Sequence, residues 1–288
     1  MGLFSLDHMS YEIDKGYQKA EVREPSLYEM TKAALATLKG QTATHQGFFL
    51  MIGGSRIDTS AHNNDPVAHA HEILEYHRTV ELVQQFVYAH PETLVISTSS
   101  HETGGFTLGY QDDPDTYPGR FWNPEVIDRA KASTEFLTRQ LYAYNTQAGK
   151  TPTQGEREEF VKAQILDQGL GITDATLEEI AYLADKDADY LKGLHFLGHA
   201  VSRRANLGWT TFGHTGVDVN LYATGDGYSN LLGNHENIAI GEAMSDYLNV
   251  DLIDITRKLQ INAHEWFKPK DGQPTSRRPR ARQPRSGR

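Results

Sequence analysis

The side chains best suited to chemistry in this sequence are histidines and carboxylates that follow apolar segments. Three such clusters come just after predicted strands: Asp58 with His62, His101 with Glu102, and His214 alone. Ligands of open α/β sheets collect at the carboxyl ends of parallel strands. We therefore expect the three clusters to lie near one another, although they are far apart in the sequence.

The residue types in these clusters indicate a divalent metal site. Asp58 and His62 are four residues apart, so both face one ion if the chain takes a helical turn there. The sequence has no cysteine, and a transition metal must therefore bind histidine or carboxylate. A catalytic zinc keeps three protein ligands and one open position. Asp58, His62 and His214 would supply those three ligands.

The sequence has 13 histidines, and a histidine is more often a surface residue or a hydrogen-bonded polar residue than a metal ligand. We interpret His69, His71 and His77, on one predicted helix, as solvated or packing residues. We interpret His195 and His199, which share a helical face without a carboxylate in a ligand pattern, as structural. The sequence contains no phosphate-binding P-loop, dinucleotide fingerprint or Gly-x-Ser-x-Gly elbow.

A strand–helix–strand pattern surrounds the first two clusters. Residues 47–53 and 93–98 are short apolar runs typical of strands covered on both faces. Between them, Asp65 and Pro66 predict the start of a helix that ends near Ala89. Short connections between these elements predict a βαβ unit with parallel strands.

The remaining pattern also alternates between helix and strand. We predict further helices at residues 26–38, 123–147, 155–205 (two or three helices) and 234–248, and further strands at residues 208–212 and 217–223. The fold class is therefore α/β. Residues 1–267 form one portion, and residues 268–288, rich in proline and arginine, form a tail predicted to be disordered.

Composition narrows the classes of protein. With 288 residues, 38% hydrophobic and 23% charged, the chain is neither collagen-like, fully disordered nor a disulfide scaffold. Its net charge of −10 disfavours nucleic-acid binding, whereas the tail, with eight basic residues and one acidic residue, could bind anions. No apolar run is long enough to span a membrane, and the first residues do not resemble a signal peptide. The sequence predicts no cellular location.

Three motifs give the chain a resemblance to a known family. They are residues 48–65 (Phe-Phe-Leu-Met-Ile-Gly-Gly-Ser-Arg-Ile-Asp-Thr-Ser-Ala-His-Asn-Asn-Asp), residues 96–105 (Ile-Ser-Thr-Ser-Ser-His-Glu-Thr-Gly-Gly) and residues 213–219 (Gly-His-Thr-Gly-Val-Asp-Val). Their order and spacing resemble those of the alkaline phosphatases, and the chain is most like the fungal vacuolar type. The resemblance runs from Gly2 to about Ile261.

The resemblance implies an α/β/α sandwich with a central, mostly parallel sheet, and a homodimer. It implies hydrolysis of phosphate monoesters through a phosphoserine intermediate, at a pair of zinc ions with magnesium nearby. By position, Asp58, His62 and His214 match the ligands of the first zinc, and His101 matches a ligand of the second. Full-length fungal relatives are vacuolar membrane proteins.

Two positions depart from the family pattern. The family has a glutamate magnesium ligand where this chain has Gly53, and an aspartate ligand of the second zinc where it has Ser100. Neutral serine is a poor substitute for a carboxylate on zinc. The magnesium site and the second zinc site are therefore expected to be weakened.

The sequence also lacks the Asp-Ser-Ala motif that carries the family's nucleophile. It begins where the second half of the family begins, so we expect an incomplete sheet and a serine supplied by the N-terminal half. Two hypotheses stay open. The chain is either part of a working phosphatase or a catalytically inactive metal-binding or dimerising homologue. The arginine-rich tail is either an anion-binding tether or a read-through terminus.

Overall fold

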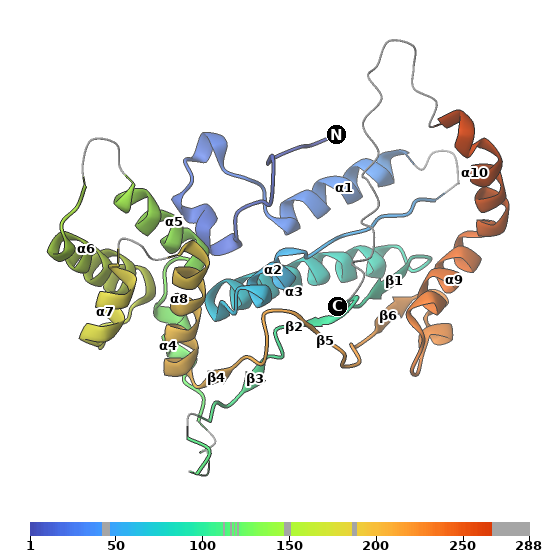
Figure 1. Ribbon diagram of the computed structural model, residues 1–288. Coiled ribbons are helices and arrows are strands. Elements are labelled where there is room, and N and C mark those ends of the chain that lie inside the picture. The colour runs from blue at the N-terminus through green and yellow to red at the C-terminus, as the bar shows by residue number, and fades with distance from the viewer. Residues whose placement is uncertain are drawn as a thin grey trace, which may run out of the picture. The chain divides into compact units, whose positions relative to one another are not determined.

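The structure is a computed structural model that describes residues 1–41, 47–111, 113–115, 117, 119, 121–146, 151–185 and 189–266. The chain divides into two compact units, Met1–Asp226 and Gly227–Arg288. Along the first unit, groups of helices are followed by groups of short strands: one group of strands comes after the helix that ends at Ala89, and another comes after the helix that ends at Ala205 (Figure 1). The mixture of helices and strands is consistent with an α/β chain. Among the described residues, no helix combines the length and the apolar character needed to cross a membrane.

The hydrophobic core of the first unit lies among the helices that follow residue 124. These are α4 (Glu125–Arg129), α5 (Thr134–Asn145), α6 (Gln154–Phe160), the π-helix η4 (Val161–Leu170), α7 (Leu177–Leu183) and α8 (Tyr190–Ala205). α8 buries Leu194, Leu197 and Val201, three or four residues apart, on one face. It contacts α3, α4 and α5 and is therefore a central support of this unit.

The N-terminal segment folds back along helix α3 (Pro66–Ala89). It contains two short 3-10 helices, η1 (Glu12–Tyr17) and η2 (Ala20–Val22), followed by α1 (Leu27–Gln41), which packs on α3 (Figure 1). The predicted capping box is present: the Ser26 hydroxyl accepts from the Glu29 amide, and the Glu29 carboxylate accepts from the Ser26 amide. The helix predicted at residues 26–38 is thus confirmed.

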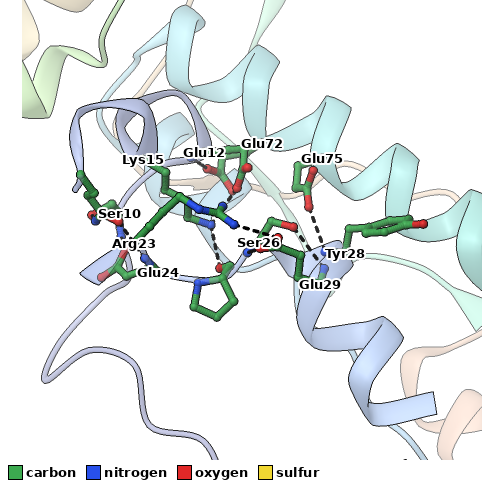
Figure 2. A network of polar contacts seen from close by, with 12 residues as sticks. Ser10, Glu12, Lys15, Arg23, Glu24, Ser26, Tyr28, Glu29, Glu72 and Glu75 are labelled. Carbon is green, nitrogen blue, oxygen red and sulfur yellow. Dashed lines mark hydrogen bonds and ion pairs between the residues drawn. The ribbon is translucent and has the colours of Figure 1, made fainter. Parts of the chain in front are cut away.

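A network of polar contacts fastens this segment to α3 (Figure 2). Two carboxylates of α3 accept backbone amides of the segment: Glu72 from Glu12 at 2.6 Å and Glu75 from Tyr28 at 2.9 Å. Lys15 donates to the Glu12 carboxylate at 2.7 Å and to a backbone carbonyl at 3.0 Å. Hydrogen bonds that involve charged groups are stronger than neutral ones, so this side of α3 is firmly covered.

Asp65 joins the start of two helices. One of its oxygens accepts the amides of Val67 and Ala68 and caps α3, while the other accepts the amide and the hydroxyl of Thr134 at the start of α5. The side chain is fully buried. Burial raises the pKa of Asp65, and the bonds to Ala68 and Thr134 oppose that rise. The predicted helix start at Pro66 is confirmed, and so is its end at Ala89.

Within the described residues, the strands are short and pair in three separate two-stranded sheets. The pairs are β1 (Leu94–Ser97) with β6 (Tyr222–Gly225), β2 (Glu102–Thr103) with β5 (His214–Thr215), and β3 (Thr107–Leu108) with β4 (Leu207–Gly208). Each pair is antiparallel. Each also joins segments about 100 residues or more apart in sequence, so these ladders hold distant parts of the first unit together.

The predicted parallel βαβ unit is wrong for the part of the chain that the structure describes. Residues 93–98 do form strand β1, but its partner is β6, and residues 47–53 form no strand. The latter residues are alternately more and less exposed, with Phe49 58% and Met51 82% exposed. An apolar run shows that a segment tends to be buried, but a ladder also needs a partner strand, which the run does not specify. The strands predicted at 208–212 and 217–223 are shorter or shifted, as β4 and β6.

In its described part, residues 227–266, the second unit contains a 3-10 helix and two α-helices. These are η5 (Tyr228–Leu231), α9 (Asn237–Leu248) and α10 (Leu252–Trp266). The helix predicted at residues 234–248 is therefore confirmed as α9. The predicted disordered tail, residues 268–288, lies outside the described residues, and the division into portions 1–267 and 268–288 stays a prediction.

Candidate metal centre

Asp58, His62 and His214 meet at one point in the first unit. The Asp58 Oδ1 atom lies 3.4 Å from His62 Nε2 and 3.5 Å from His214 Nε2. The two Nε2 atoms are 3.1 Å apart. One ligand atom from each residue lies within 4.8 Å of the others. The structure thus brings together the three side chains that the sequence singled out.

Helix α2 (Arg56–His62) presents two of these side chains. Asp58 and His62 are one turn apart on it, so their side chains share a face. The helix is anchored on its other side, because Arg56 is buried, with its guanidinium over the Tyr11 ring and paired with Glu135 at 3.1 Å. The helical turn on which the convergence of Asp58 and His62 depends is therefore present.

The ladder between β2 and β5 presents His214. In this ladder Thr103 pairs with His214 and Glu102 pairs with Thr215. The Glu102 carboxylate accepts the Thr215 hydroxyl and the backbone amides of Gly105 and Phe106. Burial opposes its ionisation, but these hydrogen bonds together hold the pKa of Glu102 below its usual range. The carboxylate therefore fixes the loop that carries Thr103 against β5.

Two further contacts orient the candidate ligands. The Thr103 hydroxyl donates to Asp58 Oδ1 at 2.6 Å. The Nδ1 atom of His62 lies 2.6 Å from the backbone oxygen of Phe212. Sequence reasoning missed both residues. Thr103 stands within the His-Glu-Thr motif and could have been suspected, but a backbone carbonyl leaves no mark on the sequence.

His101 lies beside the cluster but is not part of it. Its ring stacks on His214, with ring centroids 3.5 Å apart and an angle of 20°. Its Nδ1 atom is 4.0 Å from Asp58 Oδ1 and 3.2 Å from the Thr103 hydroxyl. The substituted positions Gly53 and Ser100 are both exposed, and a Cβ added at Gly53 would meet no heavy atom within 4 Å.

The other histidines occupy different environments. His69 is partly buried, lies 3.0 Å from the Ser60 hydroxyl and has its pKa lowered by burial. His77 is exposed and lies 3.3 Å from Glu81. His195 and His199, on α8, stack on the ring of Phe212.

The three donor atoms fit a tetrahedral zinc ion. Zinc bonds of about 2.0–2.2 Å to nitrogen and oxygen place neighbouring ligand atoms about 3.4 Å apart. The separations in the structure are 3.4, 3.5 and 3.1 Å. The side chains are also 37–48% exposed, so an ion bound there would be reachable by a substrate. This donor set and spacing can hold one divalent cation with an open position.

Comparisons with family models and with known sequences both match alkaline phosphatases. Residues 1–250 match the family model described as alkaline phosphatase. The chain is 42% identical over 262 residues to an alkaline phosphatase of Schizosaccharomyces pombe, an alignment that covers 90% of this chain and 46% of that protein. It is 36% identical over 278 residues to the repressible alkaline phosphatase of Saccharomyces cerevisiae, covering 92% and 47% respectively. The chain thus spans about half the length of these relatives.

Solved structures agree with the sequence comparison. The fold matches a cold-active alkaline phosphatase from Shewanella sp. with a TM-score of 0.61 and 29% identity, covering 77% of this chain and 50% of that one. It matches the alkaline phosphatase of Thermus thermophilus with a TM-score of 0.64 over 85% of this chain and 51% of that one. At 24% identity, the second match concerns the fold alone.

Proposed function

The chain belongs to the alkaline phosphatase family, and from this premise we propose that it supplies a zinc site for the hydrolysis of phosphate monoesters. Asp58, His62 and His214 hold the ion. The observation that carries this proposal is the convergence of one carboxylate and two imidazoles at separations of 3.1–3.5 Å, which suits tetrahedral zinc.

The chemistry of the donor set supports a cation at this point. Three electron-pair donors that face one another repel unless a proton or a cation lies between them. When bound by three protein ligands, zinc keeps a fourth position for a substrate oxygen and acts on it as a Lewis acid. The residues of this chain supply the geometry, since Thr103 orients Asp58 and the ladder of β2 and β5 holds His214.

The proposal extends to the second zinc site and the magnesium site of the family, which the substitutions at Ser100 and Gly53 affect. His101 stands at a ligand position of the family's second zinc site. Ser100 leaves that site, and Gly53 leaves the magnesium site, without one carboxylate, so this chain fills the first zinc site only. The nucleophilic serine of the phosphoserine route comes from a segment outside this sequence, which has no Asp-Ser-Ala motif. The homodimer and the α/β/α sandwich belong to the same proposal.

Zinc titration by calorimetry tests the proposed ligands. We expect one zinc ion per chain, lost in His214→Ala and retained in His77→Ala, which removes an exposed histidine outside the site. Unchanged zinc binding in His214→Ala would refute the ligand set. So would a failure of the unmodified chain to bind zinc.

Hydrolysis of an aryl phosphate, with zinc and magnesium added, tests the origin of the nucleophile. We expect no turnover by this chain alone. Turnover that His214→Ala abolishes would show that the chain contains a complete active site, and would contradict a serine supplied from outside. The assay is then repeated with the N-terminal half of a fungal relative added. Turnover in that mixture would support the hypothesis that the chain is part of a working phosphatase, and no turnover would support the inactive homologue.

A further inference from the structure

The hydrogen bond between His62 and Phe212 fixes which ring nitrogen of His62 carries the proton. The His62 Nδ1 atom is 2.6 Å from the Phe212 backbone oxygen. A carbonyl oxygen only accepts hydrogen bonds, so Nδ1 must donate and must carry the hydrogen. In the neutral ring, Nε2 then has the free electron pair, and it is Nε2 that faces Asp58 and His214.

The position of the Phe212 carbonyl is in turn fixed by its neighbours. The main chain on either side is held, because the Asn64 side chain donates to the Thr211 carbonyl at 3.0 Å and the Gly104 amide donates to the Gly213 carbonyl at 2.9 Å. The Phe212 ring lies on His195 of α8, with ring centroids 3.9 Å apart and an angle of 18°. Stacked aromatic pairs of this kind stabilise the arrangement beyond simple burial.

Helix α8 is a rigid support for this stack. Its buried face lies in the core, where Leu197 and Val201 are fully buried. At Gly198, one turn after His195, the helix approaches the end of α2 so closely that an added Cβ would lie 2.5 Å from the Asn64 backbone oxygen. The ring of His195 is therefore held at a fixed place relative to the helix that carries His62.

From these contacts we propose that His195 and Phe212 are positioning residues for His62. The stack of their rings holds the Phe212 carbonyl where it fixes the tautomer and the orientation of the His62 imidazole. This inference rests on the proposed zinc site for its purpose, but the tautomer itself can be measured without metal. Partners of this kind, which hold the second nitrogen of a metal-binding histidine, raise metal affinity about 10–100-fold.

The tautomer is tested by nitrogen NMR of the metal-free protein labelled at histidine, at about pH 8.5, where free imidazole is neutral. His62→Gln identifies the signals of His62. We expect the Nδ1–H form in the unmodified chain and in Phe212→Tyr and His195→Phe, which keep the stacked rings. We expect a mixture of tautomers in Phe212→Ala and, to a smaller extent, in His195→Ala.

Zinc affinity gives a second readout. We expect zinc to bind on the order of 10-fold more weakly to Phe212→Ala than to the unmodified chain, with affinity restored in Phe212→Tyr. The Phe212 side chain is 42% exposed, so circular dichroism should show a folded protein in each variant.

Three results would overturn the inference. They are an Nε2–H form of His62 in the unmodified chain, a tautomer that does not change in Phe212→Ala, and zinc affinity that Phe212→Ala leaves unchanged. If the unmodified chain binds no zinc, the proposed function fails, but the tautomer measurement still decides whether His195 and Phe212 orient His62. The two proposals therefore fail in distinguishable ways.

Discussion

Asp65→Ala should destabilise the protein far more than the loss of an ordinary helix cap. Asp65 is fully buried and accepts four hydrogen bonds, two from the start of α3 and two from Thr134 at the start of α5. Loss of the cap on α3 costs about 1 kcal/mol. Leaving the buried amide and hydroxyl of Thr134 without an acceptor costs about 1–3 kcal/mol for each group.

These costs are partly offset, because the variant no longer buries a carboxylate whose charge is poorly solvated. Burial is the main reason that the pKa of Asp65 is raised. We therefore expect the free energy of unfolding to fall by about 4 kcal/mol, at the upper end of single-residue effects.

Asp189→Ala is the matched control. Asp189 also caps a helix, α8, by accepting two backbone amides of that helix, but its side chain is exposed. Its loss should cost about 1 kcal/mol. Urea unfolding of both variants, followed by circular dichroism and tryptophan fluorescence, measures the difference. If the two variants lose the same stability within about 0.5 kcal/mol, the role assigned to Asp65 as a buried link between α3 and α5 is wrong.

Two further predictions concern charge. Burial raises the pKa of Asp14 from 3.8 to about 6, so the folded state binds this proton more tightly than the unfolded chain, and the charged side chain costs stability as pH rises through that window. Urea unfolding at pH 3.5 and pH 7.5 measures this for Asp14→Asn and the unmodified protein. The free energy of unfolding of Asp14→Asn minus that of the unmodified protein should be about 3 kcal/mol larger at pH 7.5 than at pH 3.5. If this difference is the same at both pH values, the raised pKa of Asp14 is wrong. Ser100→Asp returns a carboxylate beside His101 and should add a second zinc ion in calorimetry; a single ion would argue against His101 as a ligand.

The local features of the fold could be predicted because their causes are local. The side chain of Asp65 and the fixed backbone angle of Pro66 determine where α3 begins, and the capping box at Ser26 does the same for α1. Strand pairing depends on the whole chain, and for that reason the apolar run at residues 47–53 predicted a parallel partner for β1 that the described residues do not provide.

In the candidate site, too, the sequence predicted the local features but not those that depend on distant parts of the chain. The spacing of Asp58 and His62 on one helical turn was readable from the sequence. His214, 152 residues after His62, was singled out because it also follows a predicted strand, and the resemblance to a family supported the same set. The contacts that orient these side chains were not readable. One is a backbone carbonyl, and another depends on a ladder between segments more than 100 residues apart.

The ladder of β2 and β5 has only two residues in each strand. So short a ladder contributes little stability by itself, yet it joins the loop of Thr103, which bonds Asp58, to the strand that carries His214. By thermodynamic linkage, an ion that binds these side chains must stabilise the closed ladder, by a free energy that grows with the logarithm of the free ion concentration above the dissociation constant. Amide hydrogen exchange at Gly104, whose amide donates to the Gly213 carbonyl next to this ladder, would then slow on metal addition, so that this small sheet reports whether the metal is bound.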